Sequence, residues 1–307
     1  MVQAVKVRKF RFGLVWRGGE PVTTTARRAQ DTGYATLLVP DHTGQVAPFP
    51  TLAAAAAVTD QLRVGTQVVN IAFRPLGLLA QDAATIDLVS DGRLELGLGA
   101  GYAEAEFRSL GLPFPSNAAR IRLVERALTV LPRLFAGEIV TEPSGPGQLT
   151  DFRLGPTPPQ GAGLPLMVGG NGDRILTVAA RGADIVQFTG FTTPPSTHLS
   201  HFSTAGLADR VDHVRRQAGD RFADLELSLL VQVAQVTDHP ARAAEEAVGD
   251  LLPVTQALDS PFLLFGSVDA ICDRLVELRE RFGISYFTVF NWRNDGFDHV
   301  VARLAGT

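Results

Sequence analysis

The sequence predicts an α/β fold, a (β/α)8 TIM barrel formed by a single domain of residues 1–307. Eight strand-like segments occur along the chain, and most of them alternate with segments of helical periodicity, the order typical of a parallel barrel. The segment Thr36-Leu37-Leu38-Val39-Pro40 is continuously apolar, as expected of a strand buried on both faces. An open doubly wound sheet is the alternative fold.

The strands are predicted from period-two alternation and from short apolar runs bounded by turn residues. In the first half of the chain they span 10–15, 36–40, 63–69 and the stretch 91–101, in which Leu94, Leu96 and Leu98 alternate after Asp91-Gly92. In the second half they span 164–168, 183–188, 226–236 and 284–290.

The helices are predicted from apolar residues at helical spacing and from their capping residues. They span 21–32, 50–60, a segment from Leu79 to the turn at 90–92, 121–135, 175–181, 207–218 and 241–252, followed by a helix capped by Ser267 and a short terminal helix. Residues 102–117 are predicted as a loop, and 137–163 as a loop with a short hairpin. Pro132 is expected to kink its helix or to loosen the last turns.

Composition excludes several classes of protein. Lys plus Arg number 28 and Asp plus Glu number 32, so the net charge of −4 gives no basic surface for nucleic acid. The apolar run 52–58 is too short to span a membrane. Cys272 is the single cysteine, which excludes an internal disulfide, and the basic segment 1–11 has no apolar core of a signal peptide. These features predict a cytoplasmic protein.

Glycines at 97, 99 and 101 crowd the C-terminal end of the strand in 91–101. Because glycine weakens a strand, its repeated use indicates either a flat ligand close to the backbone or a tight bend at a barrel corner. We favour the ligand, since small residues also end other strands. The spacing is not the dinucleotide fingerprint, because Tyr102 and Glu104 stand where its third glycine would fall.

The run Gly169-Gly170-Asn171-Gly172 ends one predicted strand and precedes a helix. Free backbone N–H groups at such a junction form a phosphate site. Thr189 ends the neighbouring strand and can add a hydroxyl donor. The alternative is a plain turn in which Asn171 caps the helix.

His42 follows a buried strand, where barrel enzymes place side chains that face the substrate. An imidazole there can transfer a proton or bind a substrate oxygen. The alternative is a loop histidine bonded to backbone. We expect Asp41 to orient the loop, and Glu106 to bond loop backbone or an arginine such as Arg120.

No metal site is predicted. His198 and His201 are three residues apart but lack a third ligand at helical spacing. No nucleophile with a partnered base is evident either, and Arg74 and Arg93 are expected to form structural ion pairs.

Two blocks of this sequence resemble the luciferase-like monooxygenase superfamily. The first runs from Val64-Gly65-Thr66 through Arg74-Pro75 and then from Ala83 to Gly101, and the second comprises 166–172 followed by 179–184. The resemblance covers roughly residues 10–290, and its nearest branch is that of the deazaflavin (coenzyme F-420)-dependent oxidoreductases. Other branches use FMN.

The resemblance implies an insertion after strand seven, at about 237–265, and a bulge in strand three with a non-proline cis peptide at Gln67-Val68. That bulge would support the cofactor ring, with Asn70 near its polar edge. His42 matches an active-site histidine of several deazaflavin members. The cofactor phosphate region of the family matches Gly169, Gly170, Asn171, Gly172 and Thr189.

The sequence departs from the sugar-phosphate dehydrogenases of this branch. Those enzymes carry a glutamate directly after the Gly-x-Gly, where Tyr102 stands here, and the tryptophan expected after Asp41-His42 is absent from 43–49. That activity is therefore not expected.

The leading hypothesis is an oxidoreductase that moves a hydride between coenzyme F-420 and an unidentified small molecule, with His42 handling a proton. We expect cofactor contacts from Gln67, Val68, Asn70, Gly99 and Gly101 in addition to the phosphate region. The alternatives are an FMN-dependent monooxygenase and a flavin-binding protein without turnover. A homodimer is expected, because the alanines at 53–57 allow close packing of a helical face.

Overall fold

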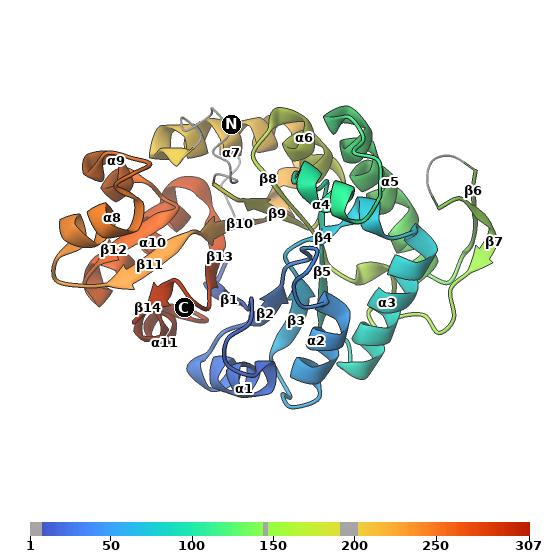
Figure 1. The fold of residues 1–307 in the computed structure, drawn as a ribbon, viewed down its shortest axis with the longest axis horizontal. Helices are drawn as coiled ribbons and strands as arrows, with labels where there is room; N and C mark the ends of the chain where they lie inside the picture. The colour runs from blue at the N-terminus through green and yellow to red at the C-terminus, as the bar shows by residue number, and fades with distance from the viewer. Residues whose placement is uncertain (1–7, 144–146, 191–201) are drawn as a thin grey trace.

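A computed structural model describes residues 8–143, 147–190 and 202–307 as a closed parallel barrel surrounded by helices (Figure 1). The strand order is β3-β2-β1-β13-β10-β9-β8-β5-β4, and pairing of β3 with β5 closes the barrel. Since β3 and β4 are two parts of one interrupted strand, the barrel has eight strand positions, as predicted. The strands are β1 (Arg11–Val15), β2 (Thr36–Val39), β3 (Arg63–Thr66), β4 (Val69–Asn70), β5 (Leu94–Gly99), β8 (Leu166–Gly170), β9 (Ile185–Phe188), β10 (Glu226–Val231) and β13 (Ile284–Phe290).

The long helices lie outside the barrel, and their ends carry the expected capping residues. The hydroxyls of Ser116, Ser203 and Ser267 accept hydrogen bonds from backbone N–H groups in the first turns of α5, α7 and α10. The helices are α1 (Val22–Thr32), α2 (Pro48–Ala56), α3 (Leu76–Val89), α4 (Glu104–Ser109), α5 (Asn117–Phe135), α6 (Asp173–Gly182), α7 (Thr204–Ala218), α8 (Pro240–Val248), α9 (Val254–Asp259), α10 (Val268–Phe282) and α11 (Asp298–Leu304). None of the helices in the described residues is long and apolar enough to cross a membrane.

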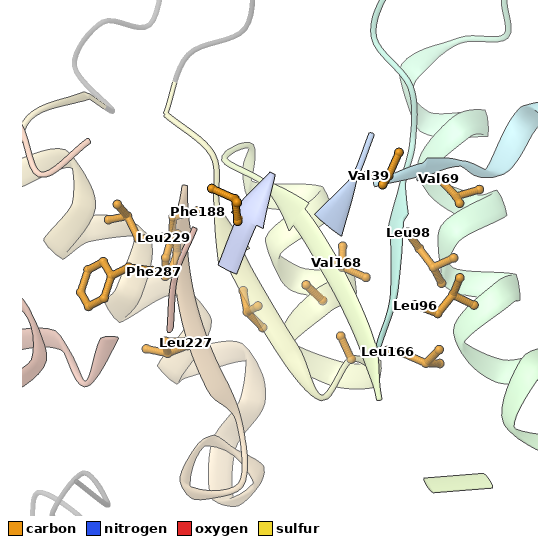
Figure 2. Close-up of a cluster of buried hydrophobic side chains, with 14 of the residues drawn as sticks. Val39, Val69, Leu96, Leu98, Leu166, Val168, Phe188, Leu227, Leu229 and Phe287 are labelled. Carbon is orange, nitrogen blue, oxygen red and sulfur yellow. The ribbon is translucent and has the colours of Figure 1, made fainter. Parts of the chain in front are cut away.

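The main core lies between the outer face of the barrel and these helices (Figure 2). Leu96 and Leu98 of β5 and Val168 of β8 are fully buried there. The residues between the leucines of β5, Glu95 and Gly97, occupy the opposite face of the strand, inside the barrel. Alternation in β5 therefore separates the core from the barrel interior.

Several predicted elements differ from the structure. The long strand predicted at 226–236 divides at Gln232: β10 stays in the barrel, and β11 (Val233–Val236) joins a small sheet with β12 (Leu263–Gly266) and β14 (Asn294–Asp295). The insertion after strand seven comprises β11, α8, α9 and β12, on the side of the molecule opposite the β6–β7 hairpin (Figure 1), and β14 joins its sheet from the segment after β13. Apolar residues continue through the division, because β10 is buried throughout and the first two residues of β11 are buried as well, so the pattern alone does not show the change of sheet.

Of the two segments predicted as loops, one matches the structure and the other contains a helix that was missed. The hairpin in 137–163 is present, with β6 (Ile139–Glu142) antiparallel to β7 (Leu149–Arg153). The loop predicted at 102–117 contains α4, which is too short to show helical periodicity. Pro132 lies inside α5, which continues to Phe135.

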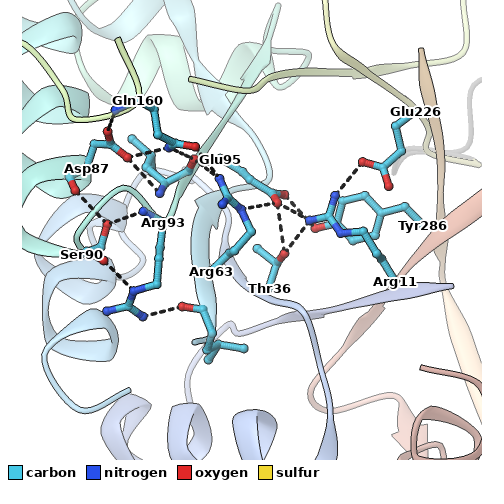
Figure 3. A network of polar contacts seen from close by, with 12 residues as sticks. Arg11, Thr36, Arg63, Asp87, Ser90, Arg93, Glu95, Gln160, Glu226 and Tyr286 are labelled. Atoms are coloured by element: carbon cyan, nitrogen blue, oxygen red, sulfur yellow. Dashed lines mark hydrogen bonds and ion pairs between the residues drawn. The ribbon is translucent and has the colours of Figure 1, made fainter. Parts of the chain in front are cut away.

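The end of the barrel at which its strands begin holds a buried charged cluster centred on Glu95 (Figure 3). Its Oε1 accepts hydrogen bonds from Arg11, from Arg63 Nε at 2.8 Å and from Thr36 Oγ1 at 3.5 Å. Its Oε2 accepts one from the Tyr286 hydroxyl at 3.2 Å. Burial and then the Glu95 carboxylate raise the pKa of Tyr286 well above its ordinary value, so this hydroxyl stays protonated. Side chains from four strands therefore converge on the carboxylate carried by a fifth.

We predict that Glu95→Gln destabilises the protein by about 3 kcal/mol, measured by urea unfolding, because two half-buried arginines lose their shared, buried counter-ion. Glu226→Gln is the control, since Glu226 bonds Arg11 alone at 2.6 Å and burial raises the pKa of its carboxyl. Its ionised form is less favourable in the folded state, so its replacement should cost less than half as much. Equal stability of the Glu95 variant and the parent would show that the cluster does not stabilise the barrel.

Candidate active site

The parallel strands bring most of the predicted site residues to one end of the barrel, its mouth, where the strands end. Asn70 is paired with Gly99, and Gly170 with Phe188, the residue before Thr189. His42 lies three residues beyond β2. The mouth therefore combines loops from strands that are far apart in the sequence.

His42 forms an ion-pair contact with Glu106 of α4 at the mouth. The His42 Nδ1 and Glu106 Oε1 atoms are 2.6 Å apart, and the two side chains are 24% and 20% exposed. The ring of Tyr102 meets the imidazole edge-on, with centroids 6.2 Å apart. Glu106 was expected to bond backbone or Arg120; instead Arg120 donates to the carbonyl oxygens of Gly101 and Pro115. The missed helix α4 is the reason, because it turns Glu106 towards β2.

The neighbouring carboxylate, Asp41, connects the loop after β2 to the segment after β4. It accepts hydrogen bonds from the Arg74 guanidinium and from the backbone N–H of Asn70 at 3.2 Å. This confirms the structural ion pair expected for Arg74. Arg93, predicted to form another, donates instead to backbone carbonyls, among them that of Leu62 at 2.6 Å.

The strand formed by β3 and β4 contains the expected bulge. Val64 pairs with Leu94 and Val69 with Leu98, so five steps along β3–β4 match four along β5, and one residue is extra. The Gln67–Val68 peptide bond within it is cis, as the family resemblance implied.

The glycines of β5 accommodate this bulge. A Cβ atom on Gly99 would lie 2.3 Å from Val68 Cγ2, and one on Gly97 would lie 2.0 Å from the Thr66 carbonyl oxygen. The space that glycine leaves is thus filled by the protein itself, which corrects the argument that a flat ligand requires it. Contact of Gly99 with a cofactor stays a prediction.

Gly101 has a similar explanation. Its φ of +69° favours glycine, and a Cβ there would lie 2.5 Å from Asn70 Nδ2. Asn70 in turn caps a short 3-10 turn, since its Oδ1 accepts from the N–H of Ala72 at 3.1 Å. The Asn70 side chain is 5% exposed.

The predicted phosphate region is divided by the structure into two parts. Gly169 and Gly170 belong to β8, which has the predicted length but begins and ends two residues later than predicted, and only Asn171 and Gly172 connect it to α6. A Cβ on Gly170 would lie 2.6 Å from Ile175 Cγ2, so glycine is needed there for packing of α6 against its strand. Nothing lies within 4 Å of a Cβ on Gly172, the N-cap residue of α6. Of these glycines, Gly172 therefore borders open space at a helix N-terminus.

Asn171 joins this region to the end of β9. Its Nδ2 donates to the Gly190 carbonyl oxygen, and its Oδ1 accepts from the Thr189 N–H at 3.2 Å. It thus holds Thr189 beside α6 rather than capping the helix, which corrects the plain-turn alternative.

Two buried glutamines lie beside the bulge, and only one of them, Gln67, was predicted from the sequence as a site residue. Gln67 Oε1 and Gln187 Oε1 have no hydrogen-bond partner. A Cβ on Gly169 would lie 3.6 Å from Gln187 Oε1 and also 3.6 Å from Val68 Cγ1. Since buried acceptors are normally satisfied, Gln67 at the bulge fits a ligand that carries N–H donors, as a flavin or deazaflavin ring does. Gln187 belongs to no sequence motif, so only its position on β9 in the folded barrel identifies it as a candidate site residue.

No cluster of three or more potential metal ligands occurs in the part of the chain that the structure describes. His198 and His201 lie outside the described residues.

Comparison with known proteins identifies the family. The sequence pattern of the luciferase-like monooxygenases matches residues 18–263, so the chain belongs to this family. A curated F-420-dependent glucose-6-phosphate dehydrogenase from Beutenbergia cavernae is 30% identical over 227 residues, which cover 71% of this chain and 64% of that protein. A pyrimidine monooxygenase from Acinetobacter baylyi is 27% identical, over 66% of this chain and 53% of that protein. The chain thus spans less than two thirds of these relatives.

Solved structures agree on the fold. The F-420-dependent tetrahydromethanopterin reductase of Methanopyrus kandleri superposes with a TM-score of 0.76 and 18% identity, over 98% of both chains. An F-420-dependent secondary alcohol dehydrogenase superposes with a TM-score of 0.77 and 18% identity, over 97% of this chain and 98% of its own. At this identity the likeness shows the fold alone, a luciferase-like barrel.

We predict that Gly172→Asp weakens binding of coenzyme F-420 and of FMN, both of which carry a phosphate, at least tenfold relative to Gly172→Asn. Both substitutions place a good N-cap residue at a φ of −72°, so helix stability is matched and only the charge differs. Titration of each variant with each cofactor gives the ratio. Equal affinities of the two variants would place the phosphate elsewhere.

Proposed function

We propose that the protein is a coenzyme F-420-dependent oxidoreductase that transfers a hydride between this cofactor and a small-molecule substrate. The observation that carries the proposal is the His42–Glu106 pair, with 2.6 Å between Nδ1 and Oε1, at the mouth of a luciferase-like barrel. The printed names of curated relatives, F-420-dependent dehydrogenases among them, support the choice of cofactor.

When bound, the deazaflavin supplies a ring that accepts or donates a hydride. We propose that the bulge holds this ring, with Gln67 and Val68 beneath it and Asn70, Gly99 and Gly101 near its edge. The phosphate is assigned to the junction of β8 and α6 together with the end of β9. That junction comprises Gly169, Gly170, Asn171 and Gly172, and Thr189 ends the strand beside it.

Glu106 orients the imidazole for proton transfer. Its carboxylate accepts from Nδ1–H of His42, which leaves Nε2 as the proton-exchanging atom. Asp41 is held by Arg74 and keeps the loop before His42 in place. Hydride transfer to or from a polar bond requires such a proton donor or acceptor.

The alternatives differ in cofactor and in turnover. The pyrimidine monooxygenase among the relatives supports an FMN-dependent monooxygenase as the second candidate. A flavin-binding protein without turnover has no use for an imidazole that a carboxylate orients, as Glu106 orients His42. Tyr102 directly after Gly101, and no tryptophan in 43–49, argue against a sugar phosphate as the substrate.

A homodimer and a cytoplasmic location also stay proposals. Within the chain, Ala55 and Ala56 of α2 are already buried. Ala53, Ala54 and Ala57 are left with exposed surface for contact with a second copy.

The proposed function predicts which of the two cofactors the protein prefers. Coenzyme F-420 should bind at least tenfold more tightly than FMN, a difference of about 1.4 kcal/mol. Parallel titrations of the purified protein with both compounds measure it. Equal or reversed affinities would favour the FMN-dependent monooxygenase.

The second prediction concerns proton transfer. His42→Ala should lower single-turnover reduction or oxidation of F-420 about a hundredfold, the usual scale for a general acid–base, with F-420 affinity changed less than threefold. Glu106→Gln should give an intermediate loss. The substrate for this assay comes from a screen of alcohols and carbonyl compounds. The control is His213→Ala on α7, whose imidazole contacts Thr177 Oγ1 at 2.9 Å. Unchanged turnover in the His42 variant would make this residue structural.

A further inference from the structure

A cation lies at the barrel mouth that the proposed function does not use. Arg17 follows β1, and its backbone N–H donates to Asn291 Oδ1 at 3.2 Å. Its Nη2 is 3.4 Å from Gln45 Oε1, in the loop that carries His42. Its Cζ is 5.9 Å from the centroid of the Phe290 ring at the end of β13. Arg17 is therefore placed between three loops of the mouth.

No carboxylate of the chain neutralises Arg17. None of the ion pairs found in 8–143, 147–190 and 202–307 includes it, although other arginines near the mouth, such as Arg74, are paired. The remaining residues, 1–7, 144–146 and 191–201, contain no Asp or Glu. A partly buried guanidinium with neutral neighbours is therefore available to an anion from outside the chain.

Aromatic surface is exposed beside this cation. Trp292 is 54% exposed, and its ring centroid is 6.0 Å from that of Phe290, which lies under Arg17. On the other side, Tyr102 is 48% exposed and lies edge-on to His42. Burial and Glu106 raise the pKa of Tyr102 while Arg17 opposes the rise, which places Arg17 within electrostatic reach of that hydroxyl. Exposed aromatic rings, Tyr102 beside His42 and Trp292 beside Phe290, favour a ligand with a planar apolar body.

We propose that the substrate is an organic anion. Arg17 binds its carboxylate or phosphate group, and Trp292 and Tyr102 contact its planar apolar body. This inference rests on the proposed function, since it places the anion beside His42, where the hydride is transferred. Arg17 is then a specificity-determining residue, and neutral analogues of the substrate bind less tightly.

The test uses three probes of similar shape: benzoate, phenyl phosphate and the neutral benzamide. Calorimetric titration of the F-420-saturated protein should show at least one of the two anions binding tenfold more tightly than benzamide. The anion that binds more tightly shows whether the site prefers a carboxylate or a phosphate group. Arg17→Gln should abolish the preference, and Arg17→Lys should retain part of it. Trp292→Leu should weaken all three probes by a similar factor.

Arg27→Gln is the matched control, because Arg27 is an exposed arginine of α1 and its loss changes the net charge equally. The proposal is overturned if neither anion is preferred, or if the preference survives in Arg17→Gln. The same probes are titrated without cofactor. Failure of F-420 to bind, with the anion preference intact, would reject the proposed function and leave the anion site standing.

Discussion

The side chain of Val68 occupies the space beside Gly99, and the shape of the barrel mouth depends on this contact. One extra residue between β3 and β4 forces a bulge, and a bulge directed into a barrel needs room on the facing strand. Glycines at 97 and 99 provide that room, since any Cβ there would overlap the bulge. The same displacement brings the N–H of Asn70 to Asp41, and thereby fixes the loop that leads to His42.

The two ends of the barrel have different physical roles. Where the strands begin, Glu95 is almost fully buried and shared by Arg11 and Arg63, so charges there are paired. Where the strands end, acceptors such as Gln67 Oε1 have no partner and Arg17 has no counter-ion. Unsatisfied groups reduce stability, and acceptors left open at the mouth of a barrel are typical of a binding site built on a stable scaffold.

Membership of the luciferase-like monooxygenase family gives these groups a chemical context. The family includes enzymes of different activities, as the F-420-dependent dehydrogenase and the pyrimidine monooxygenase among the relatives illustrate. In this chain His42 is held by Glu106, and the Arg17 guanidinium lies over the ring of Phe290.

The sequence by itself determined the barrel, the alternation of strands and helices, the capping by Ser267 and the gathering of small residues at strand ends. These follow from local periodicity and turn chemistry, which a sequence carries directly. Only the tertiary structure decided that Glu106 faces His42, that Gly99 makes room for Val68, and that β11 leaves the barrel at Gln232. Each of these depends on a contact between residues that are distant in the chain. Sequence alternation and glycine content cannot identify that contact, because they stay the same whichever residue packs against the strand.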